Sequence, residues 1–193
     1  MRNAEFDREH VLRCAMKAFM SKGYAKTSMQ DLKRATGLHP GSIYCAFENK
    51  RGLLLAALAQ YRKDRHREFE VFFATEIPVL TALRNYLNKI VTECLSCDTA
   101  QACLLTKALN ELAQQDPEIE QYISENLTRL QQALSDVFLR AQLQGEMNKA
   151  RDSAHLSRYF LMGIYGLRTF AQTRPSPEIL TQLADQLYQD VCS

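Results

Sequence analysis

Apolar side chains recur every three to four residues along most of this 193-residue chain. That spacing places them on one face of an α-helix, and no stretch shows the apolar–polar alternation of a half-buried strand. Residues that stop or start helices separate the periodic stretches: Gly23, Gly37 and Gly145 follow predicted helices, and Pro40 and Pro117 open others. The pattern predicts an all-α protein of about nine helices.

The predicted helices have clear end signals. Thr27 and Gln30 suggest a capping box for the second helix, in which the Thr27 hydroxyl accepts a backbone N–H and Gln30 reaches back. Asn49 and Asp152 are predicted to cap the fourth and eighth helices. The predicted ranges are 11–22, 28–36, 40–47, 50–74, 78–94, 100–114, 117–144, 152–173 and 177–191.

Two short helices joined by a tight turn at Gly37, after a longer supporting helix, predict a helix-turn-helix. In that motif the second helix enters the major groove of DNA, and its N-terminal residues reach base edges. Short helices joined by glycine also occur in all-α proteins that bind no DNA, so this alternative stays open. The polar candidates on and after the second helix are His39, Ser42, Cys45, Tyr44 for a phosphate, and Lys50 beside a helix N-terminus that favours an anion.

Charge is unevenly distributed along the chain. Residues 1–52 contain ten Lys or Arg and five acids, a net charge of +5, whereas the whole chain carries only +2. A basic N-terminal quarter on a mildly acidic remainder favours a nucleic-acid partner for that end. A solvated charged surface without such a partner is the alternative interpretation.

Other classes of protein find little support in the sequence. The longest apolar run, Leu53 to Ala59, is seven residues, whereas a membrane span needs about 20. The first ten residues lack the apolar stretch of a signal peptide, so we expect a cytoplasmic protein without a membrane partner. The six cysteines are predicted to be free thiols. Cys94 and Cys97 form half of a zinc motif without a second half, so no metal or cofactor is predicted.

The order and spacing of the N-terminal residues resemble the N-terminal domain of the TetR/AcrR family of transcriptional regulators. The matching segments are Phe19 to Tyr24, Thr27 and Ser28, Asp31 and Leu32, Ala35 to Leu38, Gly41 to Tyr44, Phe47, and Lys50 to Leu53. A second stretch is similar to the "GCL" segment of one branch of that family. It comprises Ala102 to Leu105, Asn110 to Leu112 and Asp116 to Glu118.

The resemblance implies a homodimer that binds a palindromic operator and releases it when an unidentified small-molecule inducer binds. It implies a DNA-binding domain in residues 1–52 and a ligand-binding and dimerisation domain in residues 53–193, bridged by the helix at about 50–74. Family members touch DNA at the positions of Thr27, Ser28, Gly41, Ser42, Tyr44 and Lys50, and His39 and Cys45 fall at variable positions that set sequence preference.

Two departures from the family pattern add expectations. His39 replaces the usual Ser or Asn before Pro40, which predicts a weaker helix cap but offers a ring to the groove. Lys33 stands where a small or apolar residue is common, and its ammonium can extend to a phosphate.

The predicted ligand-binding and dimerisation domain contains a candidate sensor. Cys103 and Lys107 are four residues apart on a predicted helix, and an ammonium near a thiol raises the thiolate fraction that electrophiles and oxidants attack. The alternative is that Cys103 is a small buried apolar residue.

The last two predicted helices are expected to form a four-helix dimer interface, as the resemblance implies. It would place the two reading helices about 34–36 Å apart. The candidate interface residues are Leu156, Phe160, Gly163, Ile164, Gly166 and Leu167. We therefore predict a ligand- or stress-responsive repressor, with covalent modification of Cys103 as an alternative form of induction. A small all-α enzyme is a distant alternative, because the sequence lacks nucleophile, phosphate-loop and metalloprotease motifs.

Overall fold

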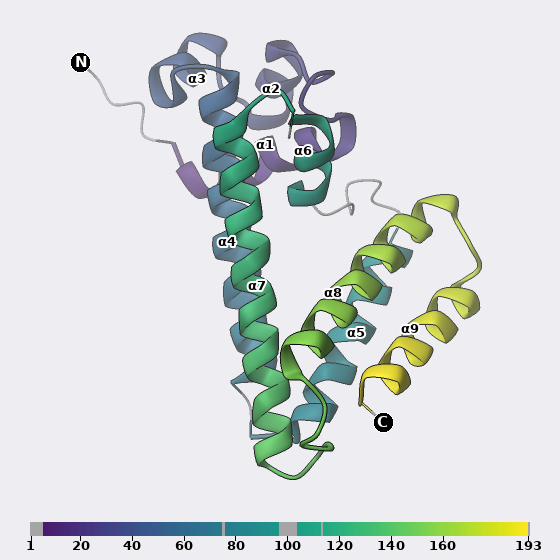
Figure 1. Ribbon diagram of the computed structural model, residues 1–193. Coiled ribbons are helices and arrows are strands. Elements are labelled where there is room, and N and C mark those ends of the chain that lie inside the picture. Colours follow the sequence, from purple (N-terminus) through teal and green to yellow (C-terminus); the bar gives the residue numbers. More distant parts are fainter. Residues whose placement is uncertain (1–5, 75, 97–103, 113, 193) are drawn as a thin grey trace. The chain divides into compact units, whose positions relative to one another are not determined.

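The structure is a computed structural model that describes residues 6–74, 76–96, 104–112 and 114–192 (Figure 1). Within these ranges the chain forms nine α-helices and one 3-10 turn, without strands, and this confirms the predicted all-α class. The helices are α1 (Arg8–Lys22), α2 (Met29–Thr36), α3 (Pro40–Phe47), α4 (Lys50–Phe73), α5 (Val79–Leu95), α6 (Leu104–Leu112), α7 (Pro117–Leu143), α8 (Ser153–Phe170) and α9 (Pro177–Cys192), and the 3-10 turn η1 (Ala171–Thr173) follows α8.

Side-chain caps fix several helix starts. The Asn49 side chain accepts the Gly52 N–H at 2.9 Å and the Asp152 carboxylate accepts the Ala154 N–H at 2.9 Å, so both predicted caps are confirmed. Each cap satisfies a backbone donor that the helix itself leaves unpaired.

The predicted capping box of α2 was wrong by one residue. Ser28, not Thr27, is the N-cap: its hydroxyl accepts the Asp31 N–H at 3.1 Å, and the Asp31 carboxylate accepts the Ser28 N–H at 3.0 Å. Thr27 is fully buried, and its hydroxyl donates to the Gly23 carbonyl at 2.5 Å. The Thr27 side chain therefore holds the turn before α2 together.

The chain divides into two compact units. The first comprises residues 1–66 and 102–123, and the second comprises residues 67–101 and 124–193. This division differs from the predicted boundary after residue 52, because residues 53–66 of α4 belong to the first unit and α6, which packs on α1, joins it. The functional assignment of residues 1–52 and 53–193 stays a prediction.

The core of the first unit is apolar and comes from one face of each helix. Phe19 of α1, Leu32 of α2 and Ile43 of α3 are each 1% exposed or less. Ile43 and Phe47, four residues apart, are the buried edge of α3 that its sequence predicts. Burial of this edge turns the remaining positions of α3 outward.

In the second unit α5, α8 and α9 lie side by side (Figure 1). Phe138 of α7 and Phe160 of α8 are both fully buried and meet edge to face, with ring centroids 5.8 Å apart. Gly163 of α8 lies directly against Leu187 of α9, and an added Cβ would overlap that leucine side chain. No helix in the described part of the chain is long and apolar enough to cross a membrane.

Candidate nucleic-acid interface

The helix-turn-helix consists of α2, a turn at Gly37 and α3. Gly37 adopts a left-handed conformation (φ +72°, ψ −2°), which glycine reaches without the penalty that a side chain would add. Its N–H donates to the Lys33 carbonyl at 2.9 Å, which closes the end of α2. Pro40 then occupies the first position of α3, where a missing N–H leaves no bond unmade.

The face of α3 opposite its buried edge brings together most of the predicted DNA-reading residues. Gly41 and Cys45 are exposed, Tyr44 is 49% exposed and Ser42 is half-buried. A hydroxyl, a phenol and a thiol thus project from two turns of one helix, beside a glycine that leaves room for close approach. These groups can donate and accept hydrogen bonds to base edges and phosphates.

His39 caps α3 through its ring, and the expectation that this cap is weaker than one made by Ser or Asn stays a prediction. His39 is the N-cap, and its Nδ1 atom accepts the Gly41 N–H at 3.3 Å. A ring nitrogen therefore replaces the side-chain oxygen of Ser or Asn. Sequence statistics on caps favour oxygen acceptors, so they gave no signal for this bond.

The α2 candidates differ in how much of each side chain remains available. Lys33 and Ser28 are exposed, but the Ser28 hydroxyl also donates to the Asp31 carboxylate at 2.7 Å within the capping box. The carboxyl of Asp31 has its pKa lowered well below the usual range, chiefly by its hydrogen bond with Lys22. Because Thr27 is fully buried, the structure does not support a DNA contact through its side chain.

Lys50 lies at the start of α4, against the turn between α1 and α2. Its Nζ atom is 4.4 Å from the centre of the Tyr24 ring and donates to the Ala25 carbonyl at 3.4 Å. Burial lowers the pKa of Lys50, and the nearby Glu111 carboxylate opposes this effect. The ring and the carbonyl thus hold the ammonium in one place, and its contact with a phosphate stays a prediction.

A strained turn connects α3 to α4. Glu48 has a positive φ (φ +66°, ψ −49°), and the Asn49 N–H donates to the Phe47 carbonyl at 2.7 Å across it. Such a three-residue turn is rare for a residue with a side chain. Gly52 sits so close to Phe47 that an added Cβ would overlap the Phe47 carbonyl oxygen. These contacts fix the direction of α4 relative to α3. No sequence pattern predicted them.

Helix α6 contacts the end of α1 and the turn that follows it through two charged side chains. Lys107 donates to the Met20 carbonyl at 2.6 Å and to the Ser21 carbonyl at 3.4 Å. Glu111 accepts the Ala25 N–H at 3.2 Å. The predicted partner of Lys107, Cys103, lies outside the described residues, so the sensor pair stays a prediction. The observed partners of the Lys107 ammonium are backbone carbonyls at the C-terminal end of α1.

The candidate dimer interface requires a correction. The four large candidates are 5% exposed or less, because their side chains form the core of the second unit. They are Leu156, Phe160, Ile164 and Leu167. Gly163 packs on Leu187 of the same chain, whereas Gly166 is exposed and has nothing within 4 Å of an added Cβ.

A different face of α8 and α9 is apolar and exposed. Met162 is 60% exposed and Phe170 40% on α8, while Ile179 is 43% and Leu183 44% exposed on α9. The helical repeat of α8 identified its apolar positions correctly. It did not distinguish the side that is buried in the core of the second unit from the side that is exposed to solvent.

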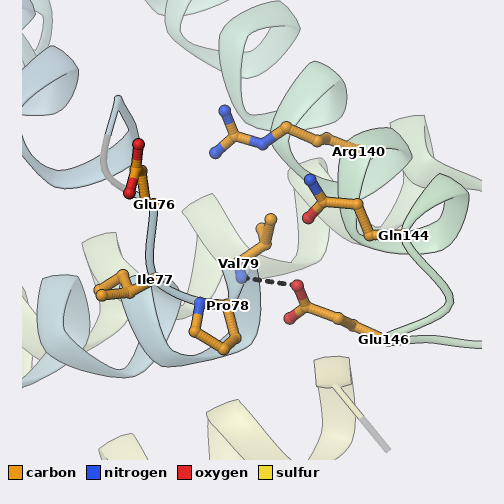
Figure 2. Close-up of a pocket in the computed structure, with 7 residues that line it drawn as sticks. All are labelled: Glu76, Ile77, Pro78, Val79, Arg140, Gln144 and Glu146. Carbon is orange, nitrogen blue, oxygen red and sulfur yellow. Dashed lines mark hydrogen bonds between the residues drawn. The ribbon is translucent and has the colours of Figure 1, made fainter.

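A pocket of about 350 Å³ lies in the second unit, beside the start of α5 (Figure 2). Glu146 accepts the N–H groups of Val79 and Leu80, each at 2.8 Å, and so caps α5 with a carboxylate. Arg140 donates to the Phe73 carbonyl at 2.7 Å. The lining is rich in charged and amide side chains, unlike the mostly apolar lining of a drug-sized ligand site. Its residues are Glu76, Ile77, Pro78, Val79, Arg140, Gln144 and Glu146.

Comparison with known sequences adds independent evidence. Residues 11–57 match the family model described as "Bacterial regulatory proteins, tetR family". The HTH-type transcriptional repressor ComR of Escherichia coli K12 is 31% identical, over 93% of this chain and 86% of ComR. The uncharacterised HTH-type transcriptional regulator YezE of Bacillus subtilis 168 is also 31% identical, over 82% of each chain.

Solved structures share the arrangement of helices. A cysteine mutant of the TetR family regulator CifR, in complex with a 26-base-pair operator DNA, has a TM-score of 0.86 at 23% identity, covering 97% of this chain and 98% of that one. The reduced form of NemR from E. coli has a TM-score of 0.85 at 15% identity, covering 96% of each chain. At these identities the likeness establishes a common fold.

Proposed function

Because this chain belongs to the TetR family of bacterial regulatory proteins, we propose that it represses transcription by binding a palindromic operator as a homodimer. The observation that carries the proposal is the match to ComR, a transcriptional repressor, along most of both chains. The matched relatives are transcriptional regulators, which favours a regulator over an enzyme. Its partner is DNA, so the bacterial cytoplasm is its proposed place of action.

The exposed face of α3 is the proposed reading surface. Ser42 and Cys45 would contact base edges, Tyr44 would contact a phosphate, and Gly41 would let the backbone approach the groove. Lys50 and Lys33 would bind phosphates from α4 and α2. Support comes from the burial of Ile43 and Phe47, which turns these polar positions outward.

A mobility-shift experiment tests the proposal directly. The probe is the DNA upstream of the protein's own gene, with an excess of unrelated duplex as competitor. We expect a retarded complex that the competitor does not remove, and weaker retardation at higher salt because phosphate contacts release counterions. Equal competition by unrelated DNA at every salt concentration would contradict sequence-specific binding. Ser42→Ala is the test variant, and Ser193→Ala is a control with the same chemical change.

A second copy of the chain is the proposed occupant of the exposed apolar face on α8 and α9. The four large side chains of that face would be removed from water, and Gly166 would allow close approach of the partner helix. Light scattering at micromolar concentration tests this: we expect twice the 22.1 kDa mass of one chain.

The proposed inducer response uses the contacts between α6 and α1. A ligand that shifts α6 would pull Lys107 from the carbonyls of Met20 and Ser21 and Glu111 from the Ala25 N–H. Those contacts hold the segment that precedes α2, so their loss would disturb the helix-turn-helix. To act, the ligand must bind one state of the protein more tightly than the other.

The Glu111→Gln variant tests this route, because it keeps the size of the side chain and removes its charge. We expect its operator affinity and its response to inducer to change together. Operator affinity and an inducer response equal to those of the wild type would contradict a role for the contact between Glu111 and the Ala25 N–H. Candidate inducers are screened by their ability to dissociate the operator complex of the wild-type protein.

Covalent induction at Cys103 is the second proposal. Two thiols of the second unit are poor candidates, because burial raises the pKa of Cys94 and raises that of Cys192 to about 12. We expect an electrophile to weaken operator binding of the wild type and to leave Cys103→Ser unaffected. Equal loss in both proteins would assign the response to another thiol, with Cys45 on α3 as the first suspect. Lys107→Met should slow alkylation if its ammonium activates the thiol.

A further inference from the structure

His39 starts the reading helix, and one hydrogen bond holds its ring. Its Nδ1 atom accepts the Gly41 N–H at 3.3 Å, and its backbone has the extended conformation of an N-cap (φ −64°, ψ 143°). Its carbonyl accepts the N–H groups of Ser42 and Ile43 at 2.9 and 3.1 Å. Pro40 has no N–H, so Gly41 carries the first backbone donor of α3 and the ring satisfies it.

This bond determines where the proton of the neutral imidazole lies. An N–H can be accepted only by a ring nitrogen that carries no proton, and a neutral imidazole keeps its single proton on the other nitrogen. Since Nδ1 accepts from Gly41, the proton resides on Nε2. The side chain is exposed, and no described residue of the chain forms a hydrogen bond with Nε2.

We propose that His39 presents Nε2–H to the operator as a hydrogen-bond donor and that it reads an acceptor atom of the DNA. The inference rests on the proposed function, and it specifies the chemistry of one contact. In the major groove the acceptors are N7 and O6 of guanine, N7 of adenine and O4 of thymine, while the amino groups of cytosine and adenine are donors. Phosphate oxygens offer the same acceptor chemistry at the groove edge.

Two substitutions separate the cap from the outward donor. In His39→Asn, Oδ1 is as many bonds from the backbone as Nδ1, so it can accept the Gly41 N–H while nothing occupies the position of Nε2. In His39→Gln, the amide nitrogen is as many bonds from the backbone as Nε2, so it can donate outward while the short cap is lost. Each variant therefore keeps one function of the ring and removes the other.

The tautomer is measured without DNA. Nitrogen-15 NMR of the imidazole rings distinguishes protonated from unprotonated nitrogens, and the signals missing from His39→Asn assign the ring of His39. We expect a protonated Nε2 and an unprotonated Nδ1 at a pH where the ring is neutral. The opposite tautomer would overturn the inference while leaving the proposed repressor function intact.

The contact itself is measured with a randomised double-stranded oligonucleotide library. We expect His39→Gln to bind the sequences that the wild type selects, with a Tm about 2–4 °C lower because the cap is lost. We expect His39→Asn to keep its Tm and to bind those sequences about 2- to 12-fold more weakly per subunit, the effect of one hydrogen bond. Unchanged affinity of His39→Asn for the wild-type sequences would overturn the inference.

Modified DNA then identifies the acceptor. If the donor reads a base, a 7-deazapurine or a base without the corresponding oxygen weakens the wild type and not His39→Asn. If it reads a phosphate, an uncharged methylphosphonate has that selective effect. No selective effect at any position of the half-site would overturn the inference. If no sequence is enriched by the wild type, both the proposed function and the reading role fail.

Discussion

Arg51 and Asp116 form a two-pronged ion pair between the starts of α4 and α7. The Arg51 Nε donates to Asp116 Oδ2 at 2.5 Å, and Nη2 donates to Oδ1 at 2.9 Å. Nη2 also donates to Glu118 at 2.6 Å, and Asp116 accepts the Ile119 N–H at 3.2 Å. One carboxylate therefore caps α7 and binds the first turn of α4, directly after the reading helix.

This pair predicts a specific loss of stability in acid. The hydrogen bond with Arg51 lowers the pKa of Asp116 from 3.8 to about 2. A carboxyl with a lowered folded-state pKa stabilises the fold above its unfolded value, so this contribution is present above about pH 4 and is lost as the pH falls to about 2. Urea unfolding at pH 6, 4 and 2.5 measures it.

Asp116→Asn is the matching variant, because Asn is also a good N-cap but has no charge. We expect its stability to fall less steeply between about pH 4 and 2 than that of the wild type. Glu120→Gln is the control, since Glu120 is an exposed carboxylate in the same first turn of α7. An identical acid profile for Asp116→Asn and wild type would contradict the assigned role of the pair.

At the turn between α3 and α4, we expect two substitutions to change the stability of the fold in opposite directions. Gly52→Ala adds a Cβ that overlaps the Phe47 carbonyl, and we expect a cost of about 1–3 kcal/mol to outweigh the helix preference of Ala, about 1 kcal/mol. Glu48→Gly relieves a positive φ and should stabilise the fold by about 1 kcal/mol. Denaturant midpoints of the DNA-free protein measure both.

Gly41→Ala is the control for this pair. An added Cβ there would meet only the His39 ring nitrogen, at an ordinary contact distance of 3.5 Å. We therefore expect the variant to fold with wild-type stability or slightly better. A loss at Gly41→Ala as large as at Gly52→Ala would show that helix position, and not the Phe47 carbonyl, explains the effect.

Removing a phosphate contact lowers the salt dependence of DNA binding. We expect Lys50→Gln and Lys33→Gln each to weaken binding to all sequences and to reduce the slope of log affinity against log salt by about one per subunit. Lys149→Gln removes the same charge from an exposed position in the second unit and should leave the slope unchanged. A changed base preference with an unchanged slope would contradict a phosphate role.

The dimer face is tested by placing charge on it. Met162→Asp and Leu183→Asp put a carboxylate on exposed apolar positions of α8 and α9, so the single chain should fold normally. We expect each variant to have the mass of one chain by light scattering and to bind the operator more weakly, because only one reading helix engages at a time. Val71→Asp, at a position 68% exposed on α4, is the control. Dimers of normal affinity in both variants would reject this face.

Local patterns predicted the helices and the exposed side of α3 well. Ile43 and Phe47 are four residues apart and both are buried, so their spacing correctly predicted the inward edge of α3 and, with it, the outward face. Asn49 and Asp152 acted as predicted because a cap needs only one side chain and one nearby N–H.

Those patterns could not predict contacts between segments that are far apart in the sequence. Lys107 was matched with Cys103 because the two are close in sequence, yet its ammonium bonds to carbonyls 86 and 87 residues away. Likewise, Phe160 and Met162 are both apolar residues of α8, but packing covers one completely and leaves the other 60% exposed. Helical periodicity contains no information about which neighbour covers a face.

The close packing of Gly163 against Leu187 has a consequence for the protein's evolution. A side chain at position 163 would force either the Leu187 side chain or the two helices to shift, and so would change the shape that a second subunit must match. Duplicated copies of such a gene could therefore lose the ability to pair with one another through a single change at this position. Mixed dimers would read hybrid operators, and the changed packing of two helices within one subunit would prevent them from forming. The two regulators could then control different genes before their DNA-reading residues diverge.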